Sequence, residues 1–149
     1  MNYFEFDVTL QEVPGEISLC FSICGCPLKC DGCHSPFLFK KENGKELKED
    51  TYQTILSRYR NYATCVLFMG GEWEKDELIL RLQQARCLGY KTCLYTGLEN
   101  VDIQLLNHLN WVKTGKWIPA KGGLDSVHTN QEFREVDTGK KMNSLFQKK

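Results

Sequence analysis

Three short apolar segments, each separated from the next by a stretch with helical periodicity, constrain the fold of this chain most. The segments read TCVLFM at 64–69, KTCLYTG at 91–97 and WVKTG at 111–115. Strands that are apolar on both faces are typical of parallel sheets covered by helices. The alternation therefore predicts a compact α/β fold with a mostly parallel sheet.

Two further strands are expected near the start of the chain. Residues 2–13 and 16–23 are rich in Phe, Val, Ile and Thr, and a Pro-Gly turn pair separates them. Apolar residues recur at helical spacing over 49–60, 74–90 and 100–109, so we expect helices there. The cysteine-rich loop described below directly follows the second strand.

The length of 149 residues is typical of one domain, and it allows a core that needs no covalent staples. After Gly115 the alternation ends in a stretch rich in Gly, Pro and small polar residues, which we interpret as a functional loop. We expect one domain over 1–138 and a flexible basic tail over 139–149.

The charge balance excludes some classes of partner. Nineteen Lys and Arg residues offset nineteen Asp and Glu residues, so no basic field is available to bind nucleic acid. The N-terminal segment does not resemble a secretion signal, and the apolar runs are too short to span a bilayer. We therefore expect a cytoplasmic protein without a membrane partner, whose eight cysteines are free thiols or metal ligands.

The stretch SICGCPLKCDGCHSP contains the densest group of cysteines. Cys26, Cys30 and Cys33 have CxxxCxxC spacing, which lets three thiolates reach one inorganic centre. A structural zinc site needs four ligands, and Cys24 or His34 could supply the fourth. An iron–sulfur cubane held by three cysteines instead leaves one iron open for chemistry. The spacing favours a reactive centre, with zinc as the alternative.

A second motif, FMGGEWE, follows the strand at 64–69. Ligand sites of parallel α/β sheets gather at the carboxyl ends of the strands. Gly70 and Gly71 allow the backbone to approach a ligand closely, and Glu72 offers an acceptor to an amine or a cation. Glu72 could alternatively act as an acidic residue at a helix N-terminus.

Together the two motifs resemble those of the radical S-adenosylmethionine (SAM) enzymes. The resemblance implies a 4Fe-4S cluster on Cys26, Cys30 and Cys33, whose open iron binds SAM. It also implies that a set of further residues contacts SAM: Gly32, Cys33, His34, Gly70, Gly71, Glu72, Thr96 and Asn130. Among these, Glu72 would accept from the amino group, His34 would contact the adenine through its backbone, and Thr96 and Asn130 would contact the carboxylate or ribose. No acid, base or nucleophile of the chain is implied.

One branch of this family matches best, namely the small activating proteins of anaerobic ribonucleotide reductase. Their loops resemble GCPLKCDGCHSP, and their later motifs resemble CLYTGLE and LDSVHTNQ of this chain, over about residues 15–135. The family often has an aromatic residue where this chain has Gly32, a departure that the branch shares, and often Pro where this chain has Trp73.

A full barrel of strand–helix units does not fit in 149 residues, so we expect an open, truncated βα barrel. Such an opening suits a protein substrate. The resemblance implies an enzyme that receives an electron from a flavodoxin-type donor and cleaves SAM to a deoxyadenosyl radical. This radical would remove hydrogen from a C-terminal glycine of the large subunit of the reductase.

Two alternatives remain open at this point. The first is an activating enzyme for another glycyl radical enzyme, with the same chemistry. The second is a non-catalytic zinc-binding adaptor that uses Cys24 together with Cys26, Cys30 and Cys33.

Overall fold

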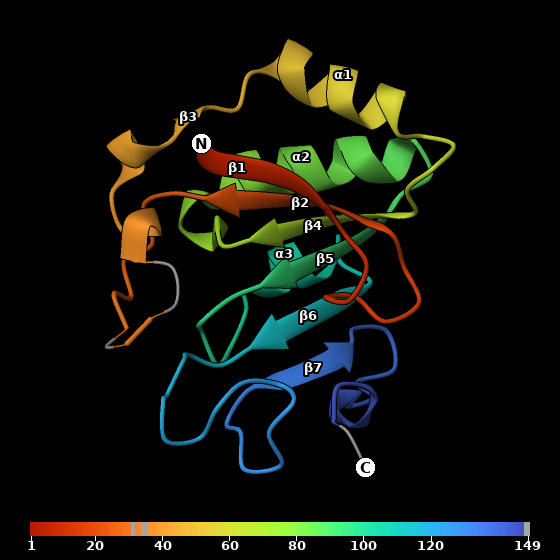
Figure 1. Ribbon diagram of the computed structural model, residues 1–149. Coiled ribbons are helices and arrows are strands. Elements are labelled where there is room, and N and C mark those ends of the chain that lie inside the picture. Colours follow the sequence, from red (N-terminus) through yellow and green to blue (C-terminus); the bar gives the residue numbers. More distant parts are fainter. Residues whose placement is uncertain (31, 34–35, 148–149) are drawn as a thin grey trace.

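The computed structural model describes residues 1–30, 32–33 and 36–147, which form a mixed α/β fold (Figure 1). Seven strands of these residues make one open sheet in the order β3-β1-β2-β4-β5-β6-β7. The strands are β1 (Asn2–Thr9), β2 (Ser18–Ile23), β3 (Lys45–Glu46), β4 (Cys65–Met69), β5 (Lys91–Tyr95), β6 (Trp111–Thr114) and β7 (Glu132–Glu135). The helices are α1 (Glu49–Arg58), α2 (Lys75–Cys87) and α3 (Ile103–Leu106), with short 3-10 turns at 36–38, 41–43, 72–74 and 143–145.

The centre of the sheet is parallel. Strands β2, β4, β5 and β6 pair in parallel, whereas β1, β3 and β7 add antiparallel pairings on either side of them. The connections between the parallel strands contain α1, α2 and α3 in turn, as parallel pairing requires. All four central strands therefore end at one edge of the sheet, here called the carboxyl edge.

One face of the sheet is covered by the three helices. Tyr52 of α1 and Leu82 of α2 are fully buried against Phe21 and Phe68 of the sheet. The Phe21 and Phe68 rings stack with centroids 5.4 Å apart, and the Tyr52 ring lies 5.5 Å from Phe21. Burying each of these side chains contributes about 1.5–3 kcal/mol, so this aromatic layer holds the helices on the sheet.

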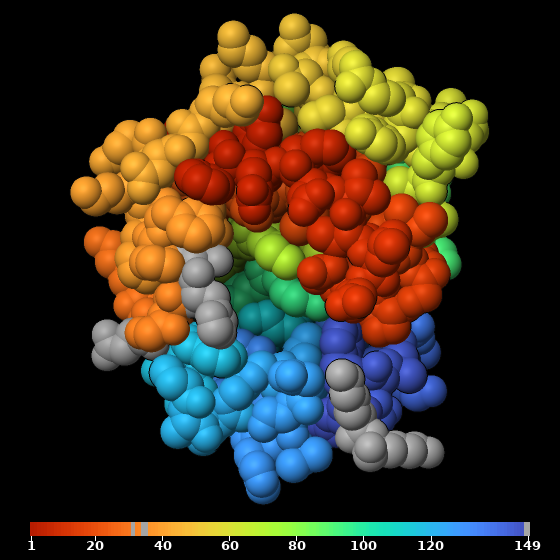
Figure 2. Space-filling view, viewed as in Figure 1, coloured from red at the N-terminus to blue at the C-terminus, as the bar shows by residue number. Residues whose placement is uncertain are grey.

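The opposite face carries no α-helix among the described residues (Figure 1). Cys65, Leu67 and Cys93 are buried on this face, where Val13 of the β1–β2 connection and Leu124 of the loop after β6 pack against them. Between the N-terminal and C-terminal segments this side of the molecule is hollowed (Figure 2). The helix-free face of the sheet is thus accessible at this hollow.

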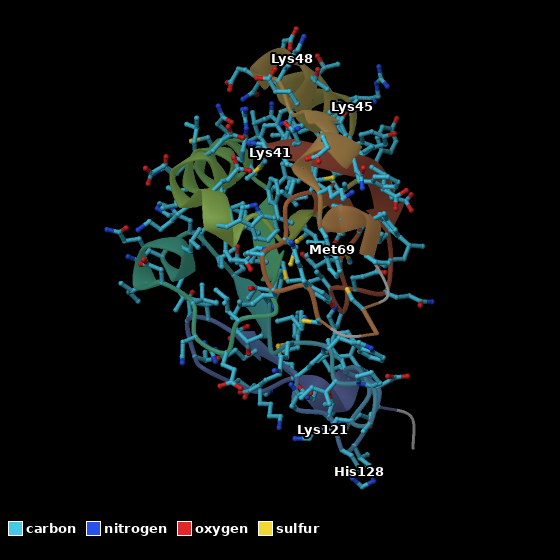
Figure 3. The ribbon with its side chains drawn as sticks, turned by 90° about the vertical axis from the view of Figure 1, so that its left-hand side faces the viewer. Lys41, Lys45, Lys48, Met69, Lys121 and His128 are labelled. Atoms are coloured by element: carbon cyan, nitrogen blue, oxygen red, sulfur yellow. The ribbon has the colours of Figure 1, made fainter. Side chains whose placement is uncertain are left out.

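The backbone register aligns Ser22, Met69, Tyr95 and Lys113 across the four central strands, near the carboxyl edge. Side chains alternate between the two faces of a strand. Residues two positions earlier in these strands pack on the helix-free face, so this row faces the same side. Met69 lies in the middle of the molecule in Figure 3, away from the exposed Lys121 and His128.

The predicted α/β class and the parallel arrangement of the central strands are confirmed. The third helix is shorter than predicted, with only residues 103–106 helical, and it begins at Ile103 because Asp102 caps it by accepting from Gln104 N. Strand β7 was not predicted, since EFRE has a single fully buried residue, Phe133, and too much charge to read as an apolar strand. In the described residues, no helix has both the length and the apolar character to cross a bilayer.

The segment after β7 contacts the sheet. Lys141 bridges to Arg134, and the Phe146 ring lies 5.1 Å from that of Phe133. The buried Asn143 accepts from Phe133 N at 2.8 Å and donates to Gln131 O at 2.9 Å. Residues up to 147 therefore form part of the wall of the helix-free face. The expected flexibility of 139–149 stays a prediction.

Replacing Asn143 by Ala should destabilise the protein by about 2–3 kcal/mol, because it leaves the buried Phe133 N–H and the Gln131 carbonyl without partners. Urea unfolding would measure this change. Ser144→Ala, at the exposed neighbouring position, is the matched control and should stay within about 0.5 kcal/mol of the wild type. Equal effects of the two substitutions would contradict the anchoring role of Asn143.

Candidate functional site

The cysteine loop leaves the end of β2 at the carboxyl edge. Gly25 N and Cys26 N donate to Leu38 O at 2.7 and 3.1 Å, which ties the start of the loop to the 3-10 turn at 36–38. Cys33 N donates to Cys30 O at 3.1 Å. Cys26, Cys30 and Cys33 are all half-buried, so the loop holds three cysteines between the sheet edge and solvent.

The three described thiols lie too far apart to bind one metal ion together. Among the described residues, no three His, Cys, Asp or Glu side chains stand close enough to hold a metal ion. Burial raises the pKa of the Cys26 thiol, and backbone hydrogen bonds from Leu28 and Lys29 partly offset this rise. Those hydrogen bonds favour a thiolate, which is the form that binds iron. Three cysteines on one short loop are a donor set that suits an iron–sulfur cluster.

Cys24 is separate from this group. It is fully buried, its N–H donates to Asn2 O at 2.9 Å, and a Cβ added at Gly44 would lie 2.6 Å from its Sγ. Burial also raises the pKa of its thiol. Cys24 therefore packs beneath the loop against Gly44.

The Gly-Gly turn after β4 has the backbone angles that its sequence suggests. Gly70 has a φ of +83° and Gly71 a φ of +106°, and residues other than glycine rarely adopt such backbone angles. A Cβ at Gly70 would lie 2.7 Å from Cη2 of Trp73, and a Cβ at Gly25 would lie 3.3 Å from its Nε1. The Trp73 indole thus packs against both glycines, linking the turn to the cysteine loop. This explains the aromatic residue at 73.

Glu72, immediately after this turn, has an unusual environment. Thr96 Oγ1 donates to Glu72 Oε1 at 2.6 Å, whereas Oε2 is buried without a hydrogen-bond partner among the described residues. Burial raises the pKa of the carboxyl, against the opposing effects of Thr96 and the Lys113 charge. An unpaired buried carboxylate oxygen costs free energy unless a donor reaches it. The site is therefore suited to a ligand with a cationic or amine donor.

A small cavity of about 210 Å³ lies beside Glu72. Cys26, Gly70 and Thr96 contribute to its wall, and Trp73 closes one side. It is smaller than the roughly 300 Å³ at the lower end of ordinary ligand pockets. It can hold only a ligand, or part of one, about the size of an amino acid.

A larger crevice of about 650 Å³ opens on the helix-free face of the sheet, in the hollow seen in Figure 2. Cys33 borders it, as do Trp117 and Gln131 from the chain after β6. Tyr95 and Lys113 line both cavities. The two spaces therefore adjoin across these two side chains.

Lys113 brings a positive charge into this region. Its Nζ donates to Gly115 O at 3.2 Å and lies 5.6 Å from the centre of the Tyr95 ring. Burial lowers the pKa of Lys113 to about 8, although the negative charges of Glu72, Cys30 and Cys33 act in the opposite direction. A cation and a carboxylate thus face the same small cavity.

The remaining predicted site residues lie in different places. Gly32 has a φ of +68°, and a Cβ there would lie 3.0 Å from Pro119 Cγ. Asn130 lines neither cavity, although its neighbour Gln131 lines the crevice. Gly71 is buried behind the turn against Met1. His34 lies outside the described residues.

Sequence reasoning missed Tyr95 and Lys113 as wall residues. The alternation of side chains along β6 could have indicated this position. Lys113 follows Trp111 by two positions, so the two lie on the same face, and Lys113 pairs with Tyr95 of β5. A lysine in a short strand of a predicted parallel sheet must lie near an edge or face an open site. In the structure the Lys113 side chain lines both cavities.

Gly70→Ala should be clearly more destabilising than Gly89→Ala. Both residues have a positive φ, but a Cβ at Gly89 meets nothing within 4 Å, whereas at Gly70 it would clash with Trp73. The shared backbone strain costs about 1–2 kcal/mol, and the clash should add about 1–3 kcal/mol. Urea unfolding of the two variants would compare them, and equal losses would show that Trp73 does not constrain the turn.

The chain also matches a known protein family over most of its length. Residues 14–122, well over half of the chain, match the family described as 4Fe-4S single cluster domain. No curated protein matches the chain. The matched range contains the cysteine loop, the Gly-Gly turn, Thr96 and Lys113. The chain belongs to the family of 4Fe-4S single cluster domains, and it is an iron–sulfur protein.

Proposed function

We propose that this protein is a radical SAM enzyme that generates the glycyl radical of an anaerobic ribonucleotide reductase. The family match supports the iron–sulfur cofactor. The motifs around Cys26 and Glu72 support SAM as the second cofactor. The helix-free face of an open sheet also agrees with a truncated barrel whose interior a protein substrate can enter.

The observation that carries the proposal is the buried, unpaired Oε2 of Glu72. Thr96 fixes the other oxygen of this carboxylate, and Glu72 lines the small cavity together with Cys26. An ammonium group there gains a charge-assisted hydrogen bond in a site of low polarity. The methionine end of SAM carries such a group and is the size of an amino acid. The cavity suits that end, and the larger crevice leaves room for the nucleoside.

Cys26, Cys30 and Cys33 would hold the cluster. When bound, the cluster would supply the electron for reductive cleavage of the sulfonium of SAM, which is the chemistry that abstraction of hydrogen from a substrate glycine requires. The residues of the chain have other tasks. Glu72 would orient the amino acid end, the Gly70 turn would admit it without a clash, and Trp73 would form one wall of the cavity.

The partner and the compartment belong to the same proposal. The substrate would be a glycine near the C-terminus of the large reductase subunit, and the electron would come from a flavodoxin-type donor. A different glycyl radical enzyme as substrate would use the same site. A reducing cytoplasm would keep the thiols of the cysteine loop ready to bind a cluster.

The position of Cys24 argues against the zinc-binding adaptor. That alternative needs Cys24 as a ligand, but its buried thiol packs against Gly44. Moving it to the cysteine loop would expose a core position and break its backbone bond to Asn2. Without Cys24 the loop offers three cysteines, and a structural zinc site would then need His34, which lies outside the described residues, as its fourth ligand.

Cys24→Ala and Cys30→Ala should separate the two types of centre. After anaerobic reconstitution with iron and sulfide, Cys24→Ala should retain iron near the wild-type level, because Cys24 is not a ligand. Cys30→Ala should lose most of its iron, because it removes one of three ligands. Iron analysis and visible absorbance would measure this. Equal metal loss, or a colourless protein that holds zinc, would overturn the cluster assignment.

Glu72→Gln should weaken SAM binding by about 10–100-fold, because it replaces a charge-assisted hydrogen bond by a neutral one. Glu99→Gln, at an exposed position after β5, is the control and should bind SAM normally. Calorimetric titration of the reconstituted proteins would give the affinities. Electron paramagnetic resonance of mixtures with the reductase would then report the glycyl radical, which should be present with wild type and much reduced with Glu72→Gln. A full radical yield without SAM would contradict the proposal.

A further inference from the structure

The three cysteines of the loop line three different openings of the molecule. Cys26 contributes to the small cavity beside Glu72, and Cys33 borders the large crevice. Cys30 lies instead in the wall of a third space of about 400 Å³, here called the Cys30 groove. In the proposed function, SAM and the substrate glycine occupy the small cavity and the crevice. The Cys30 groove is a separate approach to the cysteine loop, and the proposed function leaves it unused.

The Cys30 groove lies between the cysteine loop and the chain after β6, which adjoin each other in Figure 2. A Cβ at Gly97 would clash with Leu28 Cδ1 and would lie 3.7 Å from Lys116 Cα. A Cβ at Gly32 would lie 3.0 Å from Pro119 Cγ. The two segments thus pack closely at these glycines, and this packing sets the position of both walls of the groove.

The wall of the Cys30 groove combines apolar surface with positive charge. Leu28, Ile118 and Pro119 supply the apolar surface, and Lys29 and Lys116 are exposed beside it. Among the described residues neither lysine takes part in an ion pair, and the described wall contains no acidic side chain. The groove therefore presents two cations without a paired carboxylate, on a chain whose net charge is zero.

A protein that delivers an electron fits such a surface. The cluster has to receive its electron from outside the chain, and the other two openings are taken by SAM and by the substrate. Redox proteins form transient complexes with small interfaces, and opposite charges on the two surfaces speed up their encounter. An apolar strip beside two lysines is complementary to a donor that carries carboxylates around its redox centre.

We propose that the Cys30 groove is the docking surface for an acidic electron-transfer protein, and that the electron enters the cluster on the side of Cys30. One electron leaves the donor, which is oxidised, and enters the cluster, which is reduced; no bond forms or breaks. The inference rests on the proposed function, because it takes SAM and the substrate to fill the other openings. It adds the place at which the donor binds and the sign of the charge that the donor carries there.

Anaerobic stopped-flow mixing of the reconstituted protein with reduced flavodoxin, an acidic redox protein, tests the proposal in the absence of SAM. The double variant Lys29→Glu/Lys116→Glu should slow cluster reduction by about 10–100-fold at low ionic strength, because it reverses the charge that attracts the donor. The difference should shrink as salt is added, because salt screens exposed charges. Photoreduced 5-deazariboflavin, a small reductant without charge, should reduce wild type and variant at rates within about twofold of each other, because steering acts on charged donors.

Lys48→Glu is the matched control, because it makes the same change of charge at an exposed position before α1, at the top of the molecule in Figure 3. It should leave both rates unchanged. Iron analysis would verify cluster loading, and Lys116→Glu alone, outside the cysteine loop, replaces the double variant if the latter loads poorly. Unchanged reduction by flavodoxin, or equal slowing with both reductants, would overturn the docking surface.

The same measurements separate this inference from the proposed function. A wild-type protein that flavodoxin reduces at a salt-dependent rate, but that forms no glycyl radical with SAM and the reductase, would contradict the proposed function and still support the Cys30 groove. A cluster that 5-deazariboflavin reduces and flavodoxin does not would overturn the inference, while SAM binding and radical formation would continue to test the proposed function.

Discussion

The parallel pairing of β2, β4, β5 and β6 is the constraint on which the rest of the structure depends. Because these strands run in the same direction, the cysteine loop, the Gly-Gly turn, Thr96 and Lys113 all reach the carboxyl edge. The helices that connect the strands occupy one face, which leaves the other face for the crevice. A site assembled from segments about 90 residues apart thus follows from strand direction and from the crossover connections.

The electrostatics of the site arise from burial more than from close ion pairs. Glu72 is held by one hydroxyl and keeps one oxygen unpaired, and Lys113 is held by one carbonyl. Neither charge is well solvated. The hydrogen bond from Thr96 holds the Glu72 carboxylate in a fixed position.

Local motifs could be predicted from the sequence, whereas contacts between distant segments could not. The cysteine spacing and the Gly70-Gly71-Glu72 turn are contiguous, so their chemistry is visible in the chain. Thr96 was identified, but its bond to Glu72 depends on the register of β4 and β5. The position of Lys113 at the cavities could not be predicted, because a lysine in a four-residue strand reveals its face only after its neighbour Tyr95 is known. Strand β7 escaped detection because tertiary pairing at the edge outweighed its weak intrinsic pattern.

The central claim is that three cysteines hold a cluster with one open iron, at which SAM binds beside Glu72. Electron paramagnetic resonance of the reduced, reconstituted protein tests it most directly, because ligands at the open iron alter the g-values of the cluster. The account predicts a cluster signal that changes on addition of SAM and returns to its original form when SAM is removed. A cluster signal that is identical with and without saturating SAM would contradict the account.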